Sequence, residues 1–314
     1  MRRHPTTSRY SKKKNKSGRN RNVKFSIGLI MIGIMAIVGF FIYRFLTSPP
    51  IIELNEEPRV SKEVWMAFLP RDSLHFRILN FTEISKTDEG FKLFKDKIVL
   101  QFANPPLNIS ANEVDWACEI ELSESIIVNI LLLNSESAQR FEKMLSSSCG
   151  LMYEEYLNVT IWNILSIYEN QVFNSNLALL NNYLFYSGYS NVGIKKILTI
   201  LLKNTYEFYE DQDIRLAYYL AVRNKNFLSL SLTKFTPMEE LNISWQLSSL
   251  RYDGSELVKT DVYIMENQEH AIKSFFTTKK MFFVNADRAW ITDKFIIAEF
   301  HYPVSELKTI IMGM

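Results

Sequence analysis

The sequence is poor in the residues from which common catalytic and cofactor sites are built. Its 314 residues include only ten glycines, four histidines and two cysteines. It contains no G-x-G-x-x-G or P-loop pattern for phosphates and no G-x-S-x-G or S-x-x-K pattern for a serine nucleophile. The histidines lack the spacing of metal ligands: His4, His75, His270 and His301. We therefore predict no catalytic residue, no cofactor and no histidine metal site.

Acidic residues are absent from the first 44 positions, whereas residues 1–24 carry ten lysines and arginines. From residue 45 onward, 25 basic residues stand against 34 acidic ones. A nucleic-acid-binding domain would be basic, so we expect no nucleic-acid partner. The tail, which we predict to be disordered and cytoplasmic, has the charge to bind anionic lipid headgroups.

An uncharged apolar stretch of nineteen residues follows the tail, from Phe25 to Tyr43. At about 1.5 Å per residue, a helix of this length matches the hydrocarbon thickness of a bilayer. No small-x-small cleavage site follows it, so we predict an uncleaved, lipid-contacting transmembrane helix at 25–46, with a linker at 47–60. The excess of Lys and Arg before the stretch places the N-terminus in the cytoplasm and the rest outside.

Two further features agree with an extracytoplasmic location. The cysteines, Cys118 and Cys149, both follow the apolar stretch and predict one disulfide, with two separate buried thiols as the alternative. Four Asn-x-Ser/Thr sequons beyond the stretch are candidate glycosylation sites: Asn80, Asn108, Asn158 and Asn242.

For residues 61–314 we predict an α+β domain that contains an antiparallel sheet and repeated strand–helix units. We keep an arrangement of this domain in two similar halves as an alternative. An apolar strand, a polar turn and a helix follow one another at 126–145, 181–202 and 260–276. A serine is the expected helix N-cap of the first unit and Asn267 that of the last.

Other segments predict single elements of this domain. Alternating residues at 242–265 and 281–302 predict two hairpins, the first turning at Asp253-Gly254. Residues 64–70 and 114–122 predict strands, and residues 88–104 predict a helix. The last residues predict a short terminal helix.

The order of these segments resembles a family of uncharacterised membrane-anchored extracytoplasmic domains of prokaryotic type. The resemblance covers about residues 60–312 and rests on the LP-x-D start at Leu69, Pro70 and Asp72, the NSESAQRF helix entry, and the strand pair at 159–188. It implies no known activity and no catalytic residue.

Three functions remain as hypotheses. The first is a non-enzymatic binding or envelope-structural role with an unknown protein partner, through self-association, an aromatic groove or a sheet edge. The second is an anchored enzyme of glycosyltransferase type with a D-x-D metal site at Asp211 and Asp213, which a solvated loop would equally explain. The third is a carrier of lipid or lipoprotein, which needs an apolar cavity. Aromatic residues that could form a groove or simply pack in the core are Tyr206, Phe208, Tyr209, Tyr218, Tyr219 and those of 183–189.

Overall fold

The computed structural model describes residues 30–42, 51–52, 63–95, 109–123, 126–147, 152–168, 171–188, 190–223, 226–235, 243–278 and 285–314. The chain divides into two compact units, Met1–Ser48 and Pro49–Met314. Several predictions concern positions outside the described residues: the basic tail, Phe25, Tyr43, Asn108, Cys149 and Asn242.

The predicted transmembrane helix at 25–46 is not found among the residues that the structure describes. Within the predicted stretch, the described helix covers residues 30–42. No helix among the described residues is both long enough and apolar enough to cross a membrane. The helix nevertheless exposes its apolar side chains, from Val38 at 48% to Phe41 at 65%.

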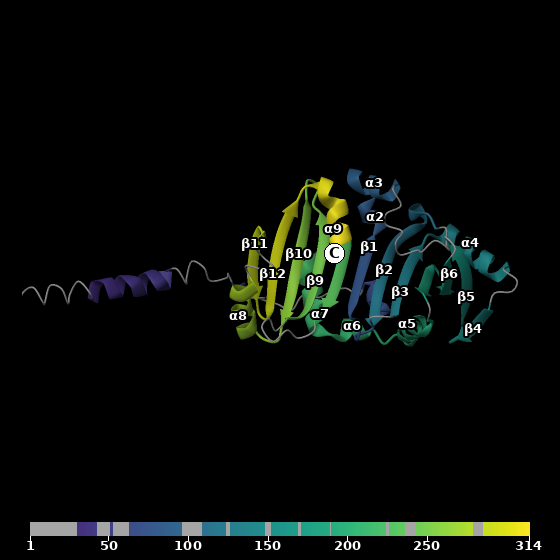
Figure 1. Ribbon diagram of the computed structural model, residues 1–314, viewed down its shortest axis with the longest axis horizontal. Helices are drawn as coiled ribbons and strands as arrows, with labels where there is room; N and C mark the ends of the chain where they lie inside the picture. The colour runs from purple at the N-terminus through teal and green to yellow at the C-terminus, as the bar shows by residue number, and fades with distance from the viewer. Residues whose placement is uncertain are drawn as a thin grey trace, which may run out of the picture. The chain divides into compact units, whose positions relative to one another are not determined.

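The second unit is built on one antiparallel sheet of twelve strands, ordered β11-β12-β10-β9-β8-β1-β2-β3-β7-β6-β5-β4 (Figure 1). The strands are β1 (His75–Asn80), β2 (Val114–Ser123), β3 (Ile126–Leu133), β4 (Met152–Tyr156), β5 (Val159–Tyr168), β6 (Gln171–Leu180), β7 (Tyr183–Gly188), β8 (Ser229–Lys234), β9 (Ile243–Tyr252), β10 (Leu257–Met265), β11 (Arg288–Thr292) and β12 (Phe295–Tyr302). The helices are η1 (Val64–Ala67), α2 (Phe81–Ile84), α3 (Asp88–Lys95), η4 (Ala111–Glu113), α4 (Ser135–Ser147), α5 (Val192–Lys203), α6 (Glu207–Glu210), α7 (Gln212–Val222), α8 (Gln268–Thr278), η5 (Val304–Glu306) and α9 (Leu307–Gly313).

This single sheet corrects the predicted fold class of repeated strand–helix units behind a transmembrane helix. Helices do follow β3, β7 and β10, but the strands after them return to the same sheet. Next to the centre of the sheet, the antiparallel pair β1 and β8 joins strands that are distant in the sequence, and Ile78 lies opposite Leu230. Local periodicity identifies strands but not their distant partners, so it does not show that all twelve join.

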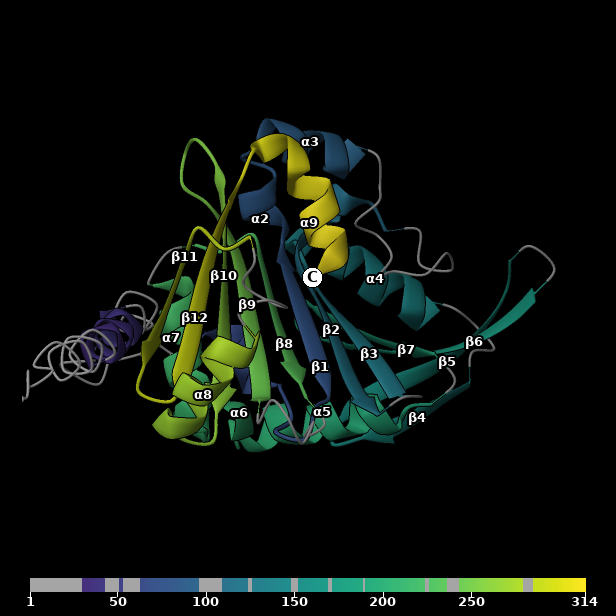
Figure 2. The same cartoon turned by 60° about the vertical axis from the view of Figure 1, so that its left-hand side comes forward.

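Helices cover both faces of the sheet, and side chains that alternate along each strand supply the two cores. The first face packs against η1, α5, α6 and α7, and its core includes Phe76 and Ile78 of β1. The second face packs against α2, α3, α4, α8 and α9, and its core includes Leu79 of the same strand (Figure 2). A helical layer on each side explains why most strands are rich in buried apolar residues.

Most of the local predictions are confirmed. β9 and β10 form the hairpin that turns after Tyr252, and β11 and β12 form the second hairpin. Asn267 caps α8 by accepting a hydrogen bond from the backbone N–H of His270 at 2.9 Å. The cap of α4 is Asn134, which accepts from the N–H of Ser137, and not a serine.

The predicted strand at 64–70 is wrong, because Val64–Ala67 form the 3-10 helix η1. A short apolar run has no periodicity that separates a strand from a buried turn of helix. Its residues Trp65 and Met66 are nevertheless buried, as the apolar run indicated.

Candidate functional site: an aromatic pocket

A pocket of about 200 Å³ lies on the first face of the sheet, near the end of β1. Five separate segments line it: the start of η1, the end of β1, one residue of β2, α7 and the segment before β8. The lining residues are Glu63, Val64, Trp65, Ile78, Asn80, Trp116, Tyr218, Asn226 and Phe227. Four of the nine are aromatic, so the pocket combines a large apolar surface with a few polar atoms.

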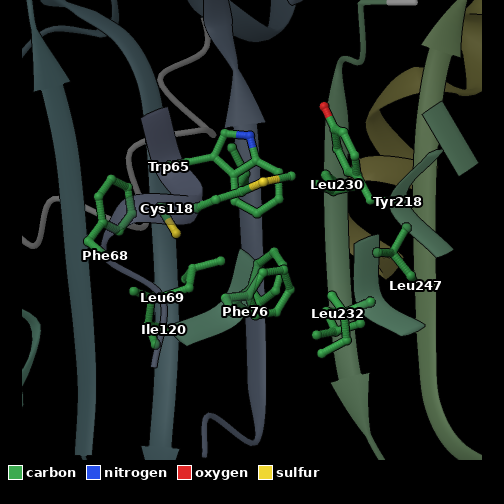
Figure 3. Packing of buried hydrophobic residues seen from close by; sticks show 14 of the residues in the cluster. Trp65, Phe68, Leu69, Phe76, Cys118, Ile120, Tyr218, Leu230, Leu232 and Leu247 are labelled. Atoms are coloured by element: carbon green, nitrogen blue, oxygen red, sulfur yellow. The ribbon is translucent and has the colours of Figure 1, made fainter. Parts of the chain in front are cut away.

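Trp65 lines this pocket and packs against three other aromatic residues. Its ring centroid lies 5.4 Å from that of Tyr218, 5.7 Å from Phe76 and 6.0 Å from Phe208. These edge-on and tilted contacts hold the indole in place. Figure 3 shows Trp65 with Phe76 and Tyr218. The residue is only 4% exposed, and its Nε1–H has no hydrogen-bond partner among the described protein atoms.

Glu63 and Tyr218 supply the pocket's polar pair. The Tyr218 hydroxyl donates to Oε1 of Glu63 at 3.4 Å. Burial, and then the neighbouring Glu63 carboxylate, raise the pKa of Tyr218, so the hydroxyl stays protonated. Among the described residues that line the pocket, Glu63 is the one with a charged side chain.

Two of the predicted glycosylation sites can be placed. Asn80 lines the pocket, where its Oδ1 accepts from the N–H of Glu83 at 3.1 Å and caps α2. Asn158 is exposed in the turn between β4 and β5, with a left-handed backbone (φ 62°). The structure thus gives Asn80 a local structural role and leaves Asn158 accessible from solvent.

The D-x-D carboxylates are engaged in local structure. Asp211 caps α7 by accepting hydrogen bonds from the N–H groups of Asp213 and Ile214, and it lies 3.8 Å from Arg71. Asp213 pairs with Lys294 at 2.8 Å. Within the described part of the chain, no three His, Cys, Asp or Glu side chains form a group that could hold a metal ion.

Cys118 is a free thiol, fully buried on β2. Figure 3 shows it among Trp65, Phe68 and Leu69. Burial raises the pKa of the Cys118 thiol well above its usual value, which keeps it protonated and poorly reactive. The structure therefore supports the buried-thiol alternative for Cys118, and its predicted bridge to Cys149 stays a prediction.

A polar row crosses the second face of the sheet. Arg77 lies opposite Glu119 on β2 and opposite Ser231 on β8, and its guanidinium is 3.8 Å from the Glu119 carboxylate. One step along β1, His75 Nδ1 lies 2.9 Å from the hydroxyl of Thr233. Burial, and then the positive charge of Arg77, lower the pKa of His75.

We expect this histidine to make the domain less stable in mild acid. Its folded pKa is below the unfolded value of about 6.5, so the unfolded chain binds the proton first and stability falls as the pH drops below about 6.5. Urea unfolding of His75→Gln should show a shallower loss of stability between pH 7.5 and pH 5 than the unmodified protein. Equal slopes for the two proteins, with His270→Gln as the control, would contradict this assignment.

No motif in the sequence distinguishes Trp65, Trp116 or Glu63. Of the aromatic residues proposed for a groove, Tyr218 lines the pocket and Phe208 packs in the core beside Trp65. The start of η1 and Tyr218 of α7 are about 150 positions apart in the chain, so no local spacing connects them. An isolated Glu-x-Trp before an apolar run was the one available signal, and it is too common to predict a site.

No protein-family model matches the sequence, and no curated protein matches it. Crystal structures of TP0453 align with it at 10% sequence identity. The alignment with crystal form III covers 81% of this chain and 99% of that chain, with a TM-score of 0.43. For crystal form IV the two shares are 76% and 92%, with a TM-score of 0.40. For crystal form I they are 81% and 98%, with a TM-score of 0.45. A likeness of this degree carries no argument about function.

Proposed function

We propose that residues 49–314 form a non-enzymatic binding domain whose ligand or partner enters the aromatic pocket. The observation that carries the proposal is the set of four aromatic side chains that line the pocket: Trp65, Trp116, Tyr218 and Phe227. The Nε1–H of Trp65 is buried without an acceptor among the described protein atoms, which costs about 1–3 kcal/mol. Because this nitrogen is covered in the structure, a ligand oxygen reaches it only if the surrounding side chains move.

The polar groups of the pocket suit binding more than reaction. The described lining residues offer one carboxylate, two amides, a phenol and two indoles, and no nucleophilic serine, cysteine or lysine. The Tyr218 hydroxyl is held as a donor by its raised pKa. These groups can orient a bound molecule, and no pair of them forms a nucleophile with an activating base.

We further propose that the chain works at a membrane. The helix at 30–42 exposes ten large apolar side chains, which lipid would cover at a gain of about 25 cal/mol for each Å² removed from water. The positive tail before it would contact anionic headgroups. In this proposal the tail is cytoplasmic and the binding domain is extracytoplasmic, because positive charges favour the inner side.

Closing the mouth of the pocket tests the binding function. Asn226 lies at the rim and is exposed, so Asn226→Trp should fill the opening without unfolding the domain. We expect it to lose about tenfold or more of the binding of any natural ligand or partner. Immobilised protein would be incubated with a detergent extract of the source membranes, and captured lipids, metabolites and proteins would be measured by mass spectrometry.

The control is Asn112→Trp, at another exposed position away from this pocket. A component captured by the unmodified protein and the control, but not by Asn226→Trp, would support the proposal. If Asn226→Trp captures the same set as the unmodified protein, the pocket is not the binding site.

A further inference from the structure

The charge of the residues that line the pocket limits which class of ligand can bind there. Glu63 carries the one charged side chain among its described lining residues, and this residue is half-buried. Its contact with the Tyr218 hydroxyl is long, at 3.4 Å, so the carboxylate can accept a shorter bond or a positive charge from a ligand. Among the described lining residues, an anionic ligand would meet a like charge and no cation.

The aromatic residues that line the pocket also favour a positively charged ligand. Trp65, Trp116, Tyr218 and Phe227 surround a small space, and the faces of such rings attract ammonium groups. Phe68 stacks on Trp116, with centroids 5.6 Å apart, and holds that ring in place. A cation in the pocket would therefore meet preorganised rings and a carboxylate.

The polar side chains and the size add two requirements. Asn80 and Asn226 line the pocket and their amide N–H groups can donate to an oxygen, so the ligand should carry a neutral oxygen close to its charge. A volume of about 200 Å³ is below the range of about 300–1,000 Å³ typical of drug-sized ligands. The pocket therefore fits a small head group and not a whole lipid.

We propose that the pocket binds a small organic cation that bears an ammonium group next to a hydroxyl or ether oxygen. This rests on the binding function proposed above and names its ligand class. The ammonium would lie against the rings and Glu63, and the oxygen would accept from the side-chain amide of Asn226. The same chemistry occurs in free amino alcohols and in the head groups of zwitterionic lipids.

The test uses choline as the probe and 3,3-dimethylbutan-1-ol as its neutral match in shape. The full chain in detergent, labelled with ¹⁵N in its five tryptophans, gives one indole signal per residue, and Trp65→Phe identifies that of Trp65. We expect choline to shift this signal and the neutral alcohol to bind about tenfold more weakly. Vesicles of phosphatidylcholine in place of free choline would show whether a lipid head group also enters.

Glu63→Gln keeps the shape of the side chain and removes its charge. It should weaken choline binding about tenfold and leave the neutral alcohol unchanged, whereas Glu155→Gln, on an exposed edge of the sheet, should change neither. Equal binding of choline and the alcohol, or a Glu63→Gln variant that binds choline normally, would overturn the proposal. If choline does not bind, but the unmodified protein still captures from membrane extracts a component that Asn226→Trp does not capture, the ligand class is wrong and the binding function stands. If both fail, the pocket is not a binding site.

Discussion

Replacing Gly90 by alanine should destabilise the domain by about 3 kcal/mol or more, although Gly→Ala in a helix usually stabilises by about 1 kcal/mol. A Cβ at this position would lie 1.7 Å from the backbone oxygen of Ile84 and 2.5 Å from the hydroxyl of Thr87. The same hydroxyl accepts from the Gly90 N–H at 2.7 Å and donates to the Ile84 oxygen at 3.0 Å. The added methyl group therefore has to push α3 away from α2.

Urea unfolding of the two alanine variants Gly90→Ala and Gly313→Ala would measure this effect. Gly313 also lies in a helix, but a Cβ there meets nothing within 4 Å. We expect Gly313→Ala to be neutral or slightly stabilising. If both variants unfold at the same urea concentration, the close packing of α2 against α3 is wrong.

Replacing Glu299 by leucine should cost about 3–5 kcal/mol, the usual loss when one partner of a buried ion pair is removed. The Glu299 and Arg251 side chains are 6% and 9% exposed, and their charged groups are 3.4 Å apart. Arg251 also donates to the hydroxyl of Thr260 at 2.9 Å, and Arg223 lies 3.2 Å from Glu299 at the surface. Without Glu299, the Arg251 guanidinium stays buried without its countercharge.

The double variant Glu299→Leu/Arg251→Met distinguishes the loss of the ion pair itself from the cost of leaving the Arg251 charge buried without a partner. Because it removes both charges, it should be more stable than Glu299→Leu alone. An exposed pair serves as the control: Glu89→Gln breaks the contact with Lys92 and should cost less than about 1 kcal/mol. A Glu299→Leu variant as stable as Glu89→Gln would mean that the cluster is not buried.

Much of the local structure could be predicted from the sequence, because periodicity, turn residues and caps act over short distances. The two C-terminal hairpins and the helices after β3, β7 and β10 follow from such signals. The order of the sheet could not, because the pairing of β1 with β8 depends on contacts between residues about 150 positions apart.

The candidate site was harder to predict than the fold. The D-x-D spacing makes Asp211 a candidate metal ligand in one alternative hypothesis, whereas its position before the helix Gln212–Val222 suits an N-cap, which the structure shows. Trp65 looked like part of a strand, and its unmatched Nε1–H exists only because η1 places it against β1 and α7. A pocket lined by five segments depends on how they pack together, which local patterns in a single sequence do not show.

The most direct test of the binding function is the indole signal of Trp65 in the ¹⁵N spectrum of the whole chain. We predict that an extract of the source membranes shifts or broadens this signal in the unmodified protein and leaves it unchanged in Asn226→Trp. An extract that contains the captured component but leaves the Trp65 signal unchanged in the unmodified protein would contradict the proposed role of the pocket.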